Sequence, residues 1–319
     1  MTQRELTQVD TIIIVKGVSM NRRDFLKATI VSSVAFSIPG AIHPLLGSLD
    51  AAEKNDLAVA HGLRPATTTK AAIDALGGIK KFISRGDIVI VKPNIGWDRT
   101  PEYAATTNPE VVSAVIRLCY EAGAKQVKVF DRTVGDPRRC YKQSGIADAA
   151  AAAGGIVSYI DERKFRDVKL PGIALKSWPL YTEAMEADKI INIPIAKNHS
   201  LSTLTLGMKN WMGIMGGSRG RIHQKIEGSL ADVAMFMKPA LIIIDAVRIL
   251  TDNGPQGGSL SDVKQLNTIV AGKDQVAVDA FGATLFGLKG ANIGSVVAGY
   301  KAGLGIMDLS KVKIKRISV

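Results

Sequence analysis

One segment, residues 196–213, concentrates groups that could bind an anion or move a proton. It contains Lys197, His199, Lys209 and Asn210, and it follows an apolar stretch typical of a buried strand. Ammonium groups that lie close together repel one another unless an anion or a carboxylate neutralises them, and an imidazole can act as a general acid or base. The segment therefore predicts a site for an anionic ligand, with His199 as the candidate catalytic group. The alternative for His199 is a hydrogen-bonded structural histidine.

Other polar residues follow further apolar stretches of the chain. Lys92, Asn94, Asp131 and Asp245 each lie at or just after the end of such a stretch. Ligands of open α/β sheets bind beyond the carboxyl ends of the strands. We therefore expect Lys92 and Asn94 to help hold the anion, and Asp131 or Asp245 to orient the catalytic histidine.

A glycine-rich segment, G-G-S-R-G-R at residues 216–221, offers a second way to hold an anion. Its backbone amides can approach a phosphate closely, and Arg221 can bind it through two hydrogen bonds. It is not a Walker loop, because the Gly-Lys-Ser/Thr sequence is absent. His223 follows, and together with His199 and Asp245 it could form a metal site; the alternative for His223 is an exposed loop histidine.

These motifs together resemble the domain of unknown function 362 family. The resemblance covers about residues 56 to 308 and implies an α/β fold with its site on these motifs. Some relatives add a ferredoxin-type cluster domain, which this sequence lacks. The matching motifs, in chain order, are Lys92-Pro93-Asn94, Lys197-Asn198-His199, Lys209-Asn210 with Gly213, Asp245, Asn253-Gly254-Pro255 with Gly258, and Asp274 to Asp279.

A more distant similarity is to the nickel-pincer lactate racemases. Those enzymes place a histidine ten residues before a lysine in a glycine-containing loop, and that lysine anchors a pyridinium cofactor. His199 and Lys209 have this spacing, with Gly207 between them. The racemase loop carries Tyr-Ser-Gly-Gly where residues 204–207 of this sequence are Leu-Thr-Leu-Gly.

The elements that must position these residues alternate between strand and helix from residue 56 onward. Alternation of this kind predicts an α/β fold with a mainly parallel sheet flanked by helices, in one unit or two lobes. Hydrophobic spacing predicts helices at 70–83, 108–122, 146–153, 274–286 and 293–302. Strands are predicted at 56–61, 87–92, 126–130, 156–160, 189–195, 241–244, 267–271 and, at an edge of the sheet, 312–317.

The first part of the chain has the features of an export signal. Residues 21–27 read N-R-R-D-F-L-K and precede a mildly apolar stretch, which is typical of a twin-arginine signal. We expect residues 20–52 to be this signal, bound by the twin-arginine translocase, and residues 1–19 to be an upstream extension. Residues 53–319 would then form the α/β domain, in the periplasm or otherwise outside the cytoplasm. The alternative is a surface helix with two exposed arginines.

Composition narrows the class of protein further. Of the 319 residues, 46% are hydrophobic and 22% are charged, which is typical of a globular chain and not of a disordered one. No apolar run approaches the roughly 18 residues of a membrane span, so we expect none. The net charge of +12 comes from scattered basic residues, whereas a nucleic-acid binder concentrates them in a patch. We therefore expect an anionic small ligand or simply a solvated basic surface.

The two cysteines, Cys119 and Cys140, limit the cofactors that this chain can hold. Two thiols cannot supply the four ligands of an ordinary iron–sulfur cluster, so we expect no such cluster from this chain alone. Cys119 lies on an apolar helix face and is expected in the core. A disulfide between the two would require an oxidising compartment.

The sequence as a whole predicts an exported enzyme or cofactor-binding protein, of unspecified cofactor, with an anion pocket at the strand ends. A non-catalytic periplasmic anion-binding protein and a redox accessory protein are the alternatives. Turnover that depends on His199 would distinguish an enzyme from a binding protein.

Overall fold

The computed structural model describes residues 56–319. The signal predicted for residues 20–52 and the extension predicted for residues 1–19 lie outside the described residues. Within 56–319 no helix is both long and apolar enough to cross a lipid bilayer.

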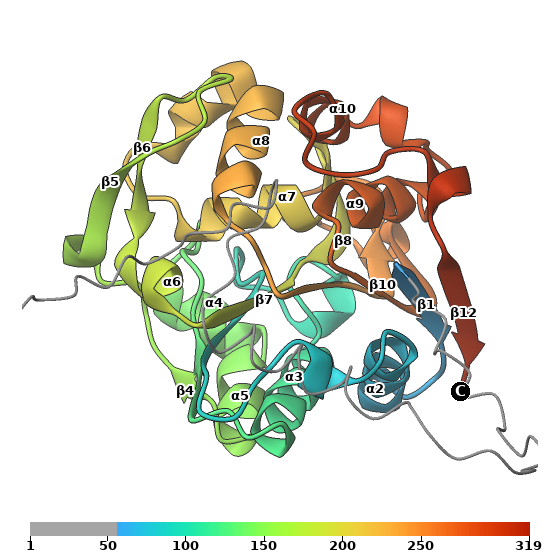
Figure 1. Cartoon of the computed structure of the whole chain (residues 1–319). Coiled ribbons are helices and arrows are strands. Elements are labelled where there is room, and N and C mark those ends of the chain that lie inside the picture. The colour runs from blue at the N-terminus through green and yellow to red at the C-terminus, as the bar shows by residue number, and fades with distance from the viewer. Residues whose placement is uncertain (1–55) are drawn as a thin grey trace, which may run out of the picture. The chain divides into compact units, whose positions relative to one another are not determined.

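A large, mainly parallel sheet forms the centre of the described chain (Figure 1). Its strands are β1 Leu57–His61, β2 Ile88–Pro93, β3 Gln126–Val129, β4 Ile156–Val157, β7 Lys189–Ile193, β8 Ile195–His199, β9 Thr203–Thr205, β10 Leu241–Leu250, β11 Val263–Gly272 and β12 Ile314–Ser318. They run in the order β12-β1-β11-β10-β7-β2-β3-β4, with β8 pairing β10 and β9. The predicted fold class is confirmed, and the last strand lies at an edge as predicted.

The parallel part of the sheet carries the site. Strands β10, β7, β2, β3 and β4 pair in parallel, so their carboxyl ends meet at one edge. Strand β11 pairs antiparallel with both β1 and β10, which makes the sheet mixed on that side. A separate two-stranded hairpin consists of β5 Phe165–Lys169 and β6 Ser177–Tyr181; it was not predicted from the sequence.

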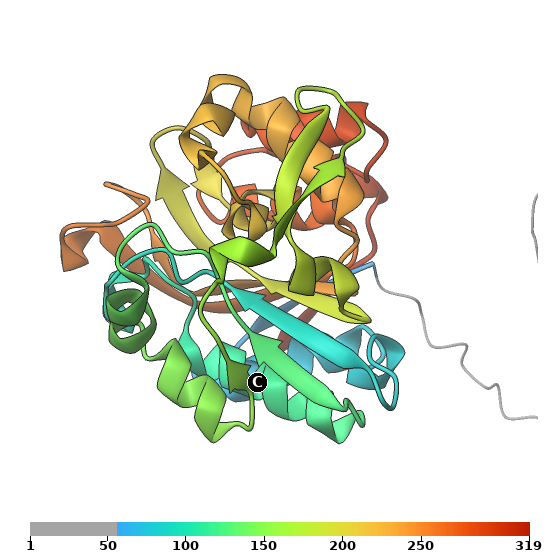
Figure 2. The same cartoon turned by 90° about the vertical axis from the view of Figure 1, so that its left-hand side faces the viewer.

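Helices cover both faces of the sheet. They are α2 Pro65–Ala75, α3 Pro109–Glu121, α4 Pro137–Gln143, α5 Ile146–Ala152, α6 Thr182–Glu186, α7 Gly207–Asn210, α8 Ile226–Phe236, α9 Gln275–Thr284 and α10 Gly294–Lys301. Figures 1 and 2 show α2, α3 and α5 on one side and α8, α9 and α10 on the other. Of these, α4, α6, α7 and α8 were not predicted.

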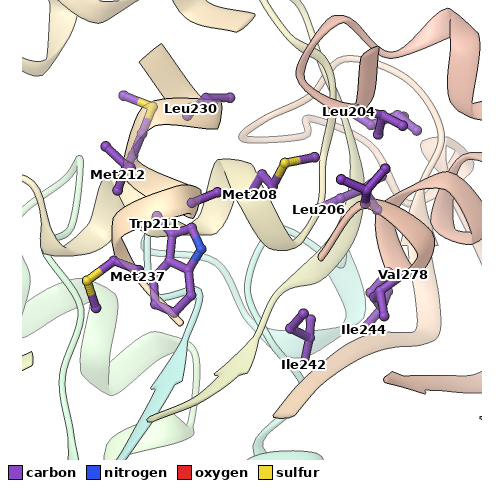
Figure 3. Packing of buried hydrophobic residues seen from close by; sticks show 14 of the residues in the cluster. Leu204, Leu206, Met208, Trp211, Met212, Leu230, Met237, Ile242, Ile244 and Val278 are labelled. Atoms are coloured by element: carbon purple, nitrogen blue, oxygen red, sulfur yellow. The ribbon is translucent and has the colours of Figure 1, made fainter. Parts of the chain in front are cut away.

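Two hydrophobic cores lie on the two sides of the sheet, because successive strand residues point to opposite faces. In β10, Leu241 and Ile243 pack with α2 and α3, whereas Ile242 and Ile244 pack with α8 and α9. Figure 3 shows the core on the side of α8 and α9, in which Trp211 and Met208 lie among side chains of the sheet and of α8. Cys119 is fully buried in the core on the side of α2 and α3, as predicted. Cys140 is also buried, and neither thiol is in a disulfide.

Three element boundaries differ from the prediction for local reasons. The helix predicted at 70–83 ends at Ala75, since Gly77 and Gly78 take φ of +103° and +82°. The strand predicted at 189–195 is interrupted at Pro194, which has no N–H to continue the ladder, and becomes β7 and β8. The strand predicted at 241–244 continues to Leu250, because its second half pairs with β11 and β8.

Candidate functional site

A cleft of about 730 Å³ lies at the carboxyl ends of β2, β3 and β8. Strand β2 leads into Asn94, β3 leads into Asp131, and β8 carries Lys197 and His199. The segment after β9 brings in α7 with Lys209. The polar lining consists mainly of Asn94, Asp131, Arg132, Thr133, Glu162, Lys197, His199, Ser200, Thr205, Lys209, Asn210, Arg219 and His223.

Helix α7 is held in place by a buried carboxylate of α9. Asp279 accepts hydrogen bonds from the backbone amides of Gly207 (2.6 Å) and Met208 (2.9 Å), which begin the helix. A Cβ on Gly207 would lie 2.8 Å from Asp279 Oδ1, so glycine permits this close approach. Burial raises the pKa of Asp279 to about 7, although the two hydrogen bonds act to lower it. This anchor fixes Lys209 and Asn210 beside the cleft.

Three asparagine side chains form a hydrogen-bonded row that ends at Lys197. Asn192 Nδ2 donates to the Gly207 carbonyl (2.9 Å), and Asn210 Nδ2 donates to Asn192 Oδ1 (2.8 Å). Asn94 Nδ2 then donates to Asn210 Oδ1 (3.0 Å). Because each amide uses its nitrogen in this direction, the oxygen of Asn94 is turned toward Lys197, whose Nζ donates to it at 3.3 Å.

A buried ion pair lies beneath the cleft. Lys92 Nζ and Asp131 Oδ1 are 2.7 Å apart, and their side chains are 0% and 3% exposed. The other oxygen of Asp131 accepts from the Ile95 amide at 2.6 Å. A Cβ on Gly213 would lie 1.6 Å from Asp131 Oδ1, so only glycine fits there. Both carboxylate oxygens of Asp131 are thus hydrogen-bonded, one to Lys92 and the other to the loop that follows β2.

Three basic side chains of the cleft, Lys197, Lys209 and Arg219, have no carboxylate partner among the described residues. Lys197 Nζ donates to the Ala105 carbonyl and to Asn94. Within residues 56–319, the only hydrogen-bond partner of Lys209 Nζ is Met212 Sδ at 3.0 Å, and Arg219 donates only to backbone carbonyls. The site therefore carries positive charge that its own side chains leave unbalanced.

Burial and this surplus charge lower the pKa of both Lys197 and Lys209. Burial lowers the pKa of Lys197 to about 7, and the charge of nearby Lys209 contributes. Burial, with Arg219 nearby, lowers the pKa of Lys209 to about 8. Desolvation and neighbouring like charge both disfavour an ammonium, so a bound anion would be stabilised here.

Two further charged groups, Arg132 and Glu162, pair with each other at the rim. Arg132 Nε lies 2.8 Å from Glu162 Oε1. Its Nη1 donates to the carbonyls of Met215 (3.1 Å) and Gly217 (3.0 Å). Arg132 therefore ties the loop after β3 to the glycine-rich segment that carries Arg219.

His199 and His223 face each other across part of the cleft. Their rings are stacked, with centroids 6.2 Å apart and planes at 24°. The Leu201 amide donates to His199 Nδ1 at 3.1 Å, so the neutral ring carries its proton on Nε2. Burial lowers the pKa of His199 to about 3, and the charges of Lys209 and Lys197 contribute. Burial and Lys209 also lower the pKa of His223.

His199 and His223 are the residues predicted to hold a metal, with Asp245 as a further ligand. The two rings face each other, but Asp245 does not line the cleft. Within residues 56–319, no three His, Cys, Asp or Glu side chains gather closely enough to hold an ion. A metal held by His199 and His223 stays a prediction.

The structure brings most of the predicted site residues together. The cleft is lined by Asn94, Asp131, Lys197, His199, Lys209, Asn210 and His223. Lys92 lies just below, paired with Asp131.

Two predicted residues lie elsewhere. Arg221 is exposed and does not line the cleft, whereas Arg219 does. Asp245 is fully buried and accepts from the amides of Asn108 (2.6 Å) and Val247 (3.0 Å). Because β10 continues to Leu250, Asp245 lies in mid-strand and not at a strand end. Burial raises its pKa to about 6.

Asn192 and Arg132 belong to the site but were not among the predicted residues. Asn192 interrupts the apolar run of β7, K-I-I-N-I, and a polar residue in a strand buried on both faces is a signal of a required hydrogen bond. Arg132 directly follows Asp131, and nothing in its local sequence indicates that its side chain bridges two loops.

The fold and the cleft define an α/β protein with a cationic site at its strand ends. The chain belongs to the family described as Domain of unknown function (DUF362), which matches residues 89–284; the predicted membership is confirmed. It is 30% identical over 241 residues to the Thylakoid-associated protein sll1697 of Synechocystis sp. (strain ATCC 27184 / PCC 6803 / Kazusa), over 73% of each chain.

Among solved structures, the chain is similar to the lactate racemase apoprotein from Thermoanaerobacterium thermosaccharolyticum. The TM-score is 0.44 and the sequence identity is 14%. The similarity covers 76% of this chain and 57% of that one, so this chain spans less than two thirds of the racemase.

Proposed function

We propose that this chain binds a small anionic ligand, bearing a carboxylate or a phosphate, in the cleft at the strand ends. One observation carries the proposal: Lys209 and Arg219 line a single cleft with no carboxylate partner among the described residues. Buried charges are normally paired. The ligand would supply the missing counter-charge.

Lys209 is the residue best placed to contact the anion. A protonated amine has three hydrogens to donate. Among the described residues, the only hydrogen-bond partner of Lys209 Nζ is a thioether, which is a weak acceptor. Arg219 differs, since its guanidinium is held by the carbonyls of Arg132, Met212 and Thr133. Its charge contributes to the field of the cleft while Lys209 makes the direct contact.

His199 would respond to the bound ligand. In the free protein, burial and the nearby lysines, first of all Lys209, hold the pKa of His199 at about 3. An anion beside Lys209 would offset those charges and raise that pKa toward the neutral range, where an imidazole exchanges protons efficiently. Binding would thereby prepare His199 to exchange a proton with its ligand.

Thermal unfolding with sulfate as the probe tests this binding. Sulfate keeps its charge across the pH range used, and we expect a saturable rise in Tm at low millimolar concentration. The affinity should be highest below pH 8 and should weaken above it, because Lys209, whose pKa is about 8, then loses its proton. A Tm that rises without saturation would indicate only the general stabilisation by sulfate and would refute the proposal.

We also propose that the chain is exported through the twin-arginine route, on the evidence of Arg22 and Arg23. The double substitution Arg22→Lys, Arg23→Lys keeps the charge but removes both guanidinium groups. In a host with this translocase, fractionation should then find the protein in the cytoplasm. The control Arg4→Lys should leave export unchanged. Periplasmic delivery of the double variant would refute the assignment.

A further inference from the structure

Lys197 differs from the other lysines of the site in its hydrogen bonds. Its Nζ donates to two acceptors, the Ala105 carbonyl and Asn94 Oδ1. A neutral amine has two hydrogens and one lone pair, whereas an ammonium has three hydrogens and no lone pair. No third acceptor for Lys197 exists among the described residues. The two partners match a neutral amine, and a third proton would stay unsatisfied.

The surroundings of Lys197 favour the same form. The charged groups that face it are Lys209 from α7, Lys92 from β2 and Asp131 after β3. Asp131 is already paired with Lys92 at 2.7 Å, so the remaining influence is cationic. The ammonium group of Lys209 disfavours protonation of the nearby buried amine, which is one way that proteins activate a lysine as a nucleophile.

The orientation of Asn94 is built into the fold. Its amide nitrogen is used by Asn210, so its oxygen must face Lys197. With both N–H groups held by Asn94 and Ala105, the lone pair of Lys197 points away from those two acceptors. Lys197 is 2% exposed and lines the cleft, so a ligand would meet its amine at the inner wall of the cleft.

We propose that Lys197 is a nucleophilic amine that condenses with the carbonyl group of an anionic keto acid or aldehyde acid. This inference rests on the proposed anion site, which would hold the acidic group near Lys209. The Nζ lone pair forms a bond to the carbonyl carbon as the π bond of the carbonyl opens, and the proton that the nitrogen gives up passes to the oxygen, which gives a carbinolamine. A proton on the hydroxyl group then lets the C–O bond break and water leave, while the nitrogen lone pair forms the C=N bond of a protonated imine; no oxidant or reductant is needed. His199 lines the same cleft and could return the proton that water departure requires.

Reductive trapping with pyruvate tests the assignment. The purified chain is incubated with pyruvate and sodium cyanoborohydride near pH 7, and peptides are mapped by mass spectrometry. We expect a carboxyethyl group on Lys197, formed at least about tenfold faster than on the exposed Lys80, because an ordinary lysine is almost fully protonated at this pH. Lactate, which has no carbonyl group, should leave no adduct.

Two variants make the test specific. Lys197→Met should abolish the fast adduct, with circular dichroism confirming that the variant folds. Asn94→Asp places a carboxylate beside the amine, which favours the ammonium form and should slow labelling about tenfold. Labelling of Lys197 at the rate of Lys80, or fast labelling of Lys209 instead, would overturn the inference.

Sulfate separates this inference from the proposed function. If both hold, sulfate competes with pyruvate and slows the labelling of Lys197. If sulfate binds in the thermal assay but pyruvate leaves no fast adduct, the anion site stands and the nucleophile is refuted. If sulfate does not bind and labelling is slow, both proposals fail.

Discussion

Replacing Asp131 by asparagine should lower the free energy of unfolding by about 3–5 kcal/mol, the usual effect of removing one partner of a buried ion pair. Lys92 is fully buried, and its carboxylate partner lies 2.7 Å away. Asparagine can still accept the hydrogen bond from Ile95, so the loss would come from the uncompensated charge of Lys92. Urea unfolding followed by tryptophan fluorescence measures it.

A double variant isolates the cause of this loss. Lys92→Met removes the ammonium but keeps much of the side-chain volume, so Lys92→Met with Asp131→Asn leaves no buried charge. Replacing both members of a buried pair is far less harmful than replacing one. We expect the double variant to regain most of the stability that Asp131→Asn loses. If Asp131→Asn alone lowers the free energy of unfolding by less than about 1 kcal/mol, the ion pair is not important for stability.

Lys209→Met should have two opposite effects: the ligand-free protein becomes more stable and sulfate binds more weakly. At pH 7 the free energy of unfolding should rise by about 1–3 kcal/mol, since each unit of pKa shift corresponds to about 1.4 kcal/mol. Sulfate affinity should fall about 10- to 100-fold, because a hydrogen bond to a charged group contributes about 1.5–3 kcal/mol.

The pH dependence gives the sign of the stability effect. Folding lowers the pKa of Lys209 from 10.5 to about 8, so between these values the unfolded chain binds more protons than the folded one. The free energy of unfolding of the wild type therefore rises with pH in this window through Lys209. The advantage of Lys209→Met should disappear by about pH 10.5, whereas Lys80→Met, at an exposed position outside the cleft, should show neither effect. If Lys209→Met is less stable than the wild type at pH 7, the inference that the charge of Lys209 is uncompensated is refuted.

The sequence by itself determined the fold class, because hydrophobic periodicity and turn residues are local signals. Apolar runs such as Val89–Val91 predicted the parallel strands. The helix predicted at 108–122 is α3, and Asn108 Oδ1 accepts from the Glu110 amide at its start at 2.8 Å. The spacing of Lys197, His199 and Lys209 also predicted one shared site, since a short segment after a strand cannot separate its residues widely.

Only the tertiary structure decided which charges are paired and which are free. Lys92 and Lys197 look alike in the sequence, yet Lys92 has Asp131 as its partner and Lys197 has only neutral acceptors. Asp245 was expected at a strand end, but pairing with β11 extends β10 beyond it and buries it. Pairing of this kind depends on residues far apart in the chain, such as Asn94 and Asn210. Long-range contacts therefore set the balance of charge on which the chemistry of the cleft depends.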